Sequence, residues 1–330
     1  MAEGEEEDGE DRISSLSDDL LVRILSNLHT RESVSTCVLS KRWVHVFKAL
    51  TCLRLDDENG SLLDALDEMR HRTDLTSFDL SIFTRRSGDI VTVAEKAVRN
   101  IVRLNLSLNS LSIYGILNMY LTRPVFNSRT LVELKLHRVC IAETLSVASL
   151  PSLKVLSLSR VQFDTKSVFL SLLSAVSRVL EELRISSPTF SAPICDREAD
   201  LFPCLRGAFL HKLPWEMLVL FISVSHLLTT LEFTPMDSRQ MEEGEENVDN
   251  WINPIIVPVC LTNQLKSCLL HGYKSTTCQD RFVRYVMLNS NILKTISIKC
   301  LPSTDTTVKY RWLKKLASWR RSSTTSLLFD

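Results

Sequence analysis

Apolar residues recur along most of this 330-residue chain in one short pattern: an apolar residue, two of any type, an apolar residue, one of any type, and a third apolar residue. The ten triplets are Leu50/Leu53/Leu55, Leu75/Phe78/Leu80, Leu108/Leu111/Ile113, Leu131/Leu134/Leu136, Leu153/Leu156/Leu158, Leu180/Leu183/Ile185, Leu205/Ala208/Leu210, Leu228/Leu231/Phe233, Leu265/Cys268/Leu270 and Leu293/Ile296/Ile298. The alternation that ends each triplet predicts a short strand whose every second side chain faces a core.

The spacing of these triplets predicts the fold class. Most middle positions follow one another at 22 to 28 residues, with two longer steps of 33 and 37, and leucine-rich repeats have periods of about 20–29 residues. We therefore expect an α/β fold in which parallel strands, joined by crossover connections, stack into a curved array. Residues 164–179 have the pattern of an outer helix. Chance matches in a leucine-rich chain are the rival explanation, and the even steps between Leu111, Leu134 and Leu156 argue against it.

Residues 11–50 have a different, helical periodicity. We expect Ser17, Thr30 and Ser40 to cap three short helices in turn. Apolar residues at helical spacing are Leu20, Leu21, Ile24, Leu25 and Leu28 in the first helix and Trp43, Phe47 and Leu50 in the third. Three helices in about forty residues bury too little surface to be stable alone. Their apolar faces must therefore meet the rest of the chain or another protein.

Composition changes mark the remaining boundaries. Residues 1–10 are predicted to be a disordered acidic tail, and 235–250 a mobile acidic loop. A more apolar region begins at 251, and the basic stretch 309–321 is better explained as a capping helix with buried aromatic side chains than as a nucleic-acid or membrane helix. Residues 326–329 predict a closing strand. The expected domains are thus 1–10, 11–50, the repeats of 51–250, and a C-terminal unit of repeats and cap at 251–330.

Charge and chemistry exclude several functions. The 39 basic residues balance the 39 acidic ones, which gives no reason to expect a nucleic acid or a membrane as a partner. The chain contains neither GxGxxG nor GxxxxGK[ST], and its seven histidines lack metal-binding spacing. None of the nine cysteines forms a CxxC pair, so we expect reduced, mostly buried thiols in a protein of the cytoplasm and/or nucleus. We expect no cofactor, no metal and no catalytic activity.

Two segments resemble a known family. Residues 11–14, 18–21, 24–26 and 39–43 match the F-box of plant F-box/leucine-rich-repeat proteins, and residues 251–330 resemble the FBD segment of the same family. The F-box usually has proline at the positions of Ser17 and His29. The resemblance implies a three-helix F-box followed by irregular leucine-rich repeats and FBD-like repeats.

The resemblance also implies a function. The chain would be the non-catalytic substrate-recognition subunit of an Skp–cullin–F-box ubiquitin ligase, whose F-box docks on a Skp-type adaptor and, through it, on a cullin–RING ligase. The matching adaptor-binding positions are Leu16, Ser17, Leu20, Leu21, Ile24, Leu25, Leu28, Val38 and Trp43. Some of these must form the core of the three helices, and the sequence does not separate the two groups.

The unknown protein target would bind the variable positions between the strand leucines. On geometric grounds the candidates are Glu133, Lys135, Lys154, Ser157, Glu182 and Arg184. Two alternatives remain open: a leucine-rich-repeat scaffold with a weak or non-docking F-box, and a receptor for a small ligand held in the repeat cavity.

Overall fold

The structure is a computed structural model that describes residues 12–57, 75–82, 101–108, 123–141, 148–190, 202–236, 251–319 and 325–330. The predicted acidic tail at 1–10 and nearly all of the predicted acidic loop at 235–250 lie outside these ranges. Within them, none of the helices combines the length and the apolar character that crossing a membrane requires.

An eleven-stranded sheet runs through the chain, and every neighbouring pair of its strands is parallel. In spatial order the strands are β1 (Cys52–Asp57), β2 (Ser77–Ile82), β3 (Arg103–Leu108), β4 (Glu133–His137), β6 (Val155–Ser159), β8 (Glu182–Ser186), β10 (Gly207–Leu213), β11 (Thr230–Pro235), β12 (Ser267–Tyr273), β13 (Thr295–Cys300) and β14 (Ser326–Phe329). The spatial order follows the chain order, which confirms the predicted mixed α/β fold with parallel strands.

The middle and last residues of the triplets pair with their equivalents from strand to strand. Leu53 lies opposite Phe78, Phe78 opposite Leu104, and so on across the sheet to Leu327. From β1 to β13 these side chains are buried in one continuous core, and Leu327 and Phe329 of β14 pack partly buried against it. The residues between them are intermediate or exposed. The period of two in the sequence therefore gives the sheet two different faces. One face is buried in the core, and the other, called the outward face below, points away from the core.

The strand predicted from the third triplet was placed at the wrong residues. The strand that pairs with β2 and β4 is β3, whose buried positions are Leu104 and Leu106 rather than Leu111 and Ile113. Ile101 precedes them with the same spacing, so both alignments fit the pattern. Pairing with Phe78 and Leu134 fixes the register, and this long-range interaction is absent from the local sequence. Leu111 and Ile113 lie outside the described residues.

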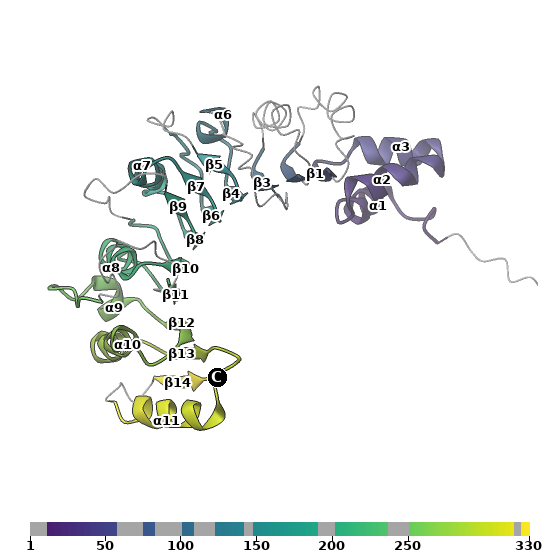
Figure 1. Ribbon diagram of the computed structural model, residues 1–330. Coiled ribbons are helices and arrows are strands. Elements are labelled where there is room, and N and C mark those ends of the chain that lie inside the picture. Colours follow the sequence, from purple (N-terminus) through teal and green to yellow (C-terminus); the bar gives the residue numbers. More distant parts are fainter. Residues whose placement is uncertain are drawn as a thin grey trace, which may run out of the picture.

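The connections place helices on the outer side of the curved sheet (Figure 1). They are α6 (Arg123–Phe126), α7 (Lys166–Val176), α8 (Trp215–Val224), α9 (Val259–Asn263), α10 (Thr277–Asn289) and α11 (Thr306–Ala317). Helix α7 confirms the outer helix predicted at 164–179. A small parallel sheet is formed by β5 (Cys140–Ile141), β7 (Gln162–Phe163) and β9 (Thr189–Phe190).

Left-handed residues turn the chain away from the strands. Arg138, Arg160, Ser187 and Lys212 all have positive φ, between 47° and 57°. The N–H of Arg138 donates to the carbonyl of Ser159, and that of Arg160 donates to the carbonyl of Ser186. The hydrogen bonds thus link one turn to the next strand. A residue other than Gly or Asn loses about 1–2 kcal/mol in this conformation.

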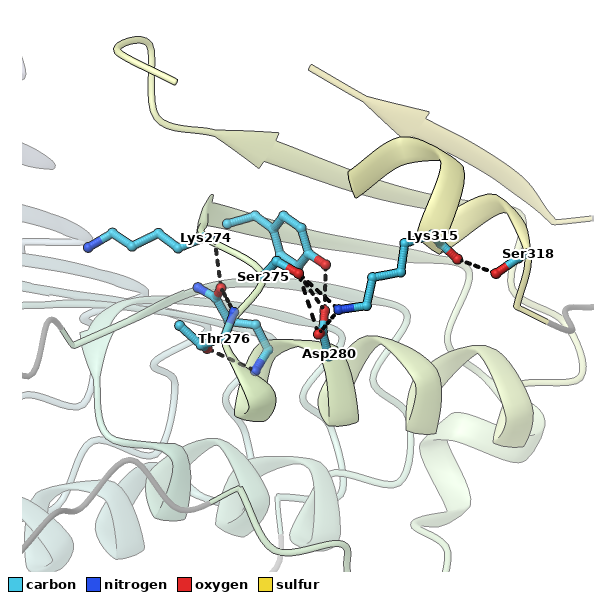
Figure 2. A network of polar contacts seen from close by, with 8 residues as sticks. Lys274, Ser275, Thr276, Asp280, Lys315 and Ser318 are labelled. Atoms are coloured by element: carbon cyan, nitrogen blue, oxygen red, sulfur yellow. Dashed lines mark hydrogen bonds and ion pairs between the residues drawn. The ribbon is translucent and has the colours of Figure 1, made fainter. Parts of the chain in front are cut away.

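A polar network fastens the last helix to the preceding one. Figure 2 shows Lys315 of α11 directed at Asp280 of α10, with Ser275 beside both side chains. The Tyr273 hydroxyl donates to Asp280 Oδ1 at 2.5 Å. Leu316 is fully buried, whereas Trp312 and Trp319 pack partly buried against the core. The predicted capping helix is present, although Tyr310 is exposed.

Candidate interaction surfaces

The N-terminal helices form a bundle with its own core. They are α1 (Asp18–Leu25), α2 (Thr30–Ser35), the 3-10 helix η1 (Thr36–Val38) and α3 (Lys41–Lys48). The buried apolar residues of this bundle are Leu21, Leu25, Trp43, Val46 and Leu50, and they form a cluster separate from the core of the sheet. Leu21, Leu25 and Trp43 were candidate adaptor contacts, and the structure places all three inside the bundle.

The other candidates lie on the surface of the bundle. Leu20 is 47% exposed and Ile24 is 46% exposed, one helical turn apart on α1. Leu28 follows in the turn after α1, and Val38 is 87% exposed at the end of η1. Further exposed apolar residues of the bundle, which were not among the adaptor-binding candidates, are Ile13, Val34 and Leu39.

The segment before α1 is held by one arginine of α3. Arg42 Nε donates to Asp18 Oδ1 at 2.7 Å, and its guanidinium also donates to the carbonyls of Ser14 and Leu16. Leu16 packs partly buried against the bundle core. Ser17 has the extended backbone of an N-cap, but its side chain makes no capping hydrogen bond. These contacts position Leu16 and Ser17 at the base of α1 without burying them completely.

Polar contacts join the bundle to the first strand. Thr30 is the first residue of α2 rather than its cap, which is His29; this corrects the prediction. The Thr30 hydroxyl instead accepts a hydrogen bond from the backbone N–H of Arg54 at 3.0 Å. Arg54 Nη1 donates to the carbonyl of Asn27, and His29 lies 3.0 Å from Asp56. The side of the bundle that carries α2 is therefore the side that faces β1.

Five of the six target-binding candidates lie on outward positions of neighbouring strands. Glu133 and Lys135 are on β4, Ser157 is on β6, and Glu182 and Arg184 are on β8; the register pairs Lys135 with Ser157 and Ser157 with Arg184. Lys135, Ser157 and Arg184 form one row across the three strands, and Glu133 and Glu182 lie two residues earlier on β4 and β8, in register with Val155. Lys154 differs from the expectation because it lies one residue before β6, where its ammonium pairs with Glu181 at 2.9 Å.

The aromatic side chain of Phe209 extends this row onto β10, where it lies in register with Arg184. The guanidinium of Arg184 lies 4.0 Å from the centre of the Phe209 ring, and its Nε donates to Glu182 at 2.5 Å. The ring in turn covers Gly207, where an added Cβ would approach Phe209 Cε2 to 3.1 Å. Glycine is thus required for the close approach of the ring to the strand. This cluster could not be predicted from the sequence, because its residues lie on two strands whose register was unknown.

Two histidines share one carboxylate further along the same face. His271 Nε2 lies 2.7 Å from Glu232 Oε1, and His211 Nε2 lies 3.4 Å from the same oxygen. Burial lowers the pKa of His211, as do His271 and Arg184, whereas Glu232 opposes the shift. Sequence inspection missed this cluster, because its residues are far apart in the chain and meet only through strand pairing.

The cysteines have the character of core residues. Cys140, Cys260, Cys268 and Cys278 are buried, and the eight cysteines in the described ranges are all free thiols. Burial raises the pKa of Cys260 and of Cys268 to about 12. These two thiols are therefore protonated at neutral pH and do not act as nucleophiles.

The class of the C-terminal unit follows from comparison with known families. A family model described as FBD matches residues 253–298, which span α9, β12, α10 and β13. The predicted FBD segment at 251–330 thus contains an FBD domain, with narrower limits than the sequence suggested.

The homologues of this chain are F-box/FBD/LRR-repeat proteins of Arabidopsis thaliana. An F-box/FBD/LRR-repeat protein is 34% identical over 190 residues, covering 53% of this chain and 39% of the relative. An FBD-associated F-box protein is 31% identical, covering 54% of this chain and 46% of the relative. A second F-box/FBD/LRR-repeat protein is 25% identical and covers 97% of this chain and 100% of the relative. The first two matches span less than half the length of those relatives.

Proposed function

We propose that this chain is the substrate-recognition subunit of an Skp–cullin–F-box ubiquitin ligase. In this proposal the N-terminal bundle is an F-box, and the curved parallel sheet is a leucine-rich-repeat solenoid that binds the protein target. In this proposal the chemistry of ubiquitin transfer belongs to the partners, and the chain acts by holding the target close to the ligase. It would work in the cytoplasm and/or nucleus, where thiols stay reduced.

The observation that carries the proposal is the exposed apolar face of α1. Leu20 and Ile24 are nearly half exposed although the bundle has a separate, filled core. Neither the sheet nor the other described helices cover them. Exposed leucine and isoleucine side chains at helical spacing are suited to pack against another protein. The F-box in the printed names of the homologues supports the same assignment.

The target would bind the outward face of the sheet. Its parallel strands present rows of side chains at regular intervals, and the outward positions on β4, β6, β8 and β10 combine charged pairs with the half-buried Phe209 ring. Arginine paired with an aromatic ring is common at the centre of protein interfaces.

A pull-down with purified Skp-type adaptor tests the proposal. The intact chain is expected to retain the adaptor, and Leu20→Asp with Ile24→Asp is expected to lose it, because two charges would be buried in the interface. The matched control is Val259→Asp with Leu288→Asp, since these residues are 45% and 53% exposed on α9 and α10. The control should retain the adaptor.

Failure of the intact chain to retain the adaptor would contradict the proposal and leave a repeat scaffold. If both double variants lost the adaptor equally, the proposal would also be contradicted, because adaptor binding would then not depend specifically on the face of α1. Circular dichroism of each variant confirms that the bundle is folded.

A further inference from the structure

A polar hollow of about 350 Å³ lies where the bundle meets the outward face of the first four strands. Its wall on the bundle side is the turn after α1, at Ser26 and Asn27. The remaining lining comes from β1 to β4: Cys52, Arg54, Ser77, Phe78, Asp79, Arg103, Leu104, Asn105, Glu133 and Lys135. The bundle therefore closes one side of a hollow whose remaining lining comes from the strands.

The short side chains of Cys52 and Ser77 leave the hollow unfilled, and Arg54 and Arg103 border it. In the strand register Cys52 lies beside Ser77 and Ser77 beside Arg103, while Arg54 lies beside Asp79. Arg54 and Arg103 are thus two strands apart, with the short Ser77 side chain on the strand between them. Both arginines are exposed. Their guanidinium groups can reach one ligand group from opposite sides.

The charges of the hollow are compensated unequally. Asp79 Oδ1 accepts a hydrogen bond from Asn105 Nδ2 at 3.0 Å, and Glu133 pairs with Lys135 at 2.5 Å. Arg54 donates from Nη1 to the backbone carbonyl of Asn27 at 3.2 Å. Among the residues that the structure describes, no carboxylate pairs with Arg54 or Arg103. The partner of Asp79 is a neutral amide, so the lining carries the cations Arg54, Arg103 and Lys135 against the carboxylates Asp79 and Glu133. Its net charge is positive.

We propose that this hollow binds an anionic side chain of the protein target, a carboxylate or a phosphate, between Arg54 and Arg103. Guanidinium groups donate paired, charge-assisted hydrogen bonds to both kinds of oxyanion. That the ligand belongs to a protein target rests on the proposed function; that it is anionic rests on the geometry alone. A basic ligand side chain fits less well, because the cations of the lining outnumber its carboxylates and Glu133 is already paired with Lys135.

The hollow also links the two proposed surfaces. Ser26 and Asn27 line it, and the next residue, Leu28, is one of the exposed apolar residues of the bundle. A target anchored here is held directly beside the adaptor surface. Such a position favours ubiquitin transfer by placing the target near the ligase.

Binding of peptide pools to the full-length chain tests the inference. The probes are fluorescein-labelled random peptides that share one fixed central residue, which is phosphoserine, glutamate, serine or lysine, and fluorescence polarisation measures their binding. We expect the phosphoserine pool, or both acidic pools, to bind better than the serine and lysine pools. Preference for phosphoserine alone identifies a phosphate ligand, and equal binding of both acidic pools shows that a carboxylate suffices.

Substitutions of Arg54 and Arg103 test whether the acidic peptides bind in the hollow. Arg54→Glu with Arg103→Glu is expected to weaken binding of the acidic pools roughly tenfold or more, because two charge-assisted donors are replaced by repulsive charges. Arg54→Gln with Arg103→Gln, which carries less risk to folding, should weaken it in the same direction. The matched control, Arg281→Glu with Arg284→Glu, changes two exposed arginines of α10 and should bind like the unmodified chain.

Two results would overturn the inference: acidic pools that bind no better than the serine pool, or acidic binding that survives both Arg54 and Arg103 variants. The adaptor pull-down separates this failure from failure of the proposed function. Variants of Arg54 and Arg103 should still retain the adaptor, and the Leu20 and Ile24 variant should still bind acidic peptides. If the intact chain retains no adaptor but binds acidic peptides through the arginines, the hollow stands and the ligase assignment fails.

Discussion

The backbone N–H of Arg54 in β1 donates a hydrogen bond to the Thr30 hydroxyl at the start of α2. Thr30 is buried, and its contact crosses from the bundle to the sheet over 24 residues of chain. It replaces the bond that a preceding strand would give to this edge of the sheet. The bundle therefore takes the place of a preceding repeat at β1.

Replacing Thr30 with valine should loosen this junction. Valine keeps the volume but removes the acceptor, so we expect a loss of about 1–2 kcal/mol and faster hydrogen exchange at the Arg54 amide. Thr51→Val, an exposed change beside the same strand, is the control and should have little effect. Unchanged exchange at Arg54 would show that the contact does not hold the bundle.

Two consecutive leucines in α1 should respond differently to truncation. Leu21 is fully buried and Leu20 is 47% exposed, so Leu21→Ala should destabilise the bundle by about 2–5 kcal/mol and Leu20→Ala by less than about 0.5 kcal/mol. Hydrogen exchange over 18–48 measures the local stability. Equal effects would contradict the separation of core and surface residues described above.

The left-handed turn at Arg160 offers a stabilising substitution. Its φ is 51°, a conformation that asparagine adopts more easily than arginine, whereas a β-branched residue is strained there. We expect Arg160→Asn to raise the free energy of unfolding by about 0.5–1 kcal/mol and Arg160→Val to lower it by at least about 1 kcal/mol. Urea denaturation measures both. Arg129→Asn, at a residue outside the left-handed region, should not be stabilising.

Acidification should destabilise the sheet through His137 and His211. Burial lowers the pKa of both side chains, and Arg138 and Arg160 lower the pKa of His137 further. As pH falls below the unfolded value of about 6.5, the unfolded state takes up protons before the folded state does. Stability is therefore complete above this pH and falls below it, towards the lowered folded values.

Urea midpoints between pH 7.5 and 5 measure this dependence. His137→Gln with His211→Gln should reduce the slope of stability against pH in this range. His226→Gln is the control, because the His226 side chain is exposed. A slope that the double variant leaves intact would assign the dependence to other groups.

The contact between Asp280 and Lys315 should hold α11 in place. The Asp280 side chain is only 17% exposed and also accepts from Tyr273 and Ser275. Asp280→Ala therefore removes the acceptor of these two hydroxyls and the counter-ion of Lys315, which keeps only its hydrogen bond to Ser275. We expect a loss of about 1–3 kcal/mol in local stability, seen as faster hydrogen exchange over 306–317. Lys315→Met should have a smaller effect, because Lys315 is 44% exposed. Unaltered exchange in Asp280→Ala would show that apolar packing alone fixes the helix.

Most of the sheet could be predicted because its signal is local. Leu134 and Leu136, like their equivalents in eight other triplets, occupy the buried positions that the period of two assigned to them. The third triplet failed because Ile101/Leu104/Leu106 and Leu108/Leu111/Ile113 have the same spacing. Only hydrogen-bonded pairing with the neighbouring strands distinguishes them, and that pairing involves residues more than twenty positions away.

The candidate surfaces were predicted less completely for the same kind of reason. Helical spacing marked Leu20 and Leu21 equally, since a broad apolar face includes both the residues that fill a core and those beside it. Arg54 and Arg103 were not marked at all. No local pattern distinguishes an arginine beside an empty space from one on an ordinary surface.

The sequence by itself determined which side chains are apolar, how often they recur and therefore which elements form, because helices and strands impose their periods on a few adjacent residues. The tertiary structure alone decided which apolar residues are covered and which charges are left without partners. Burial and ion pairing depend on what lies across from each side chain, and that neighbour comes from a distant part of the chain.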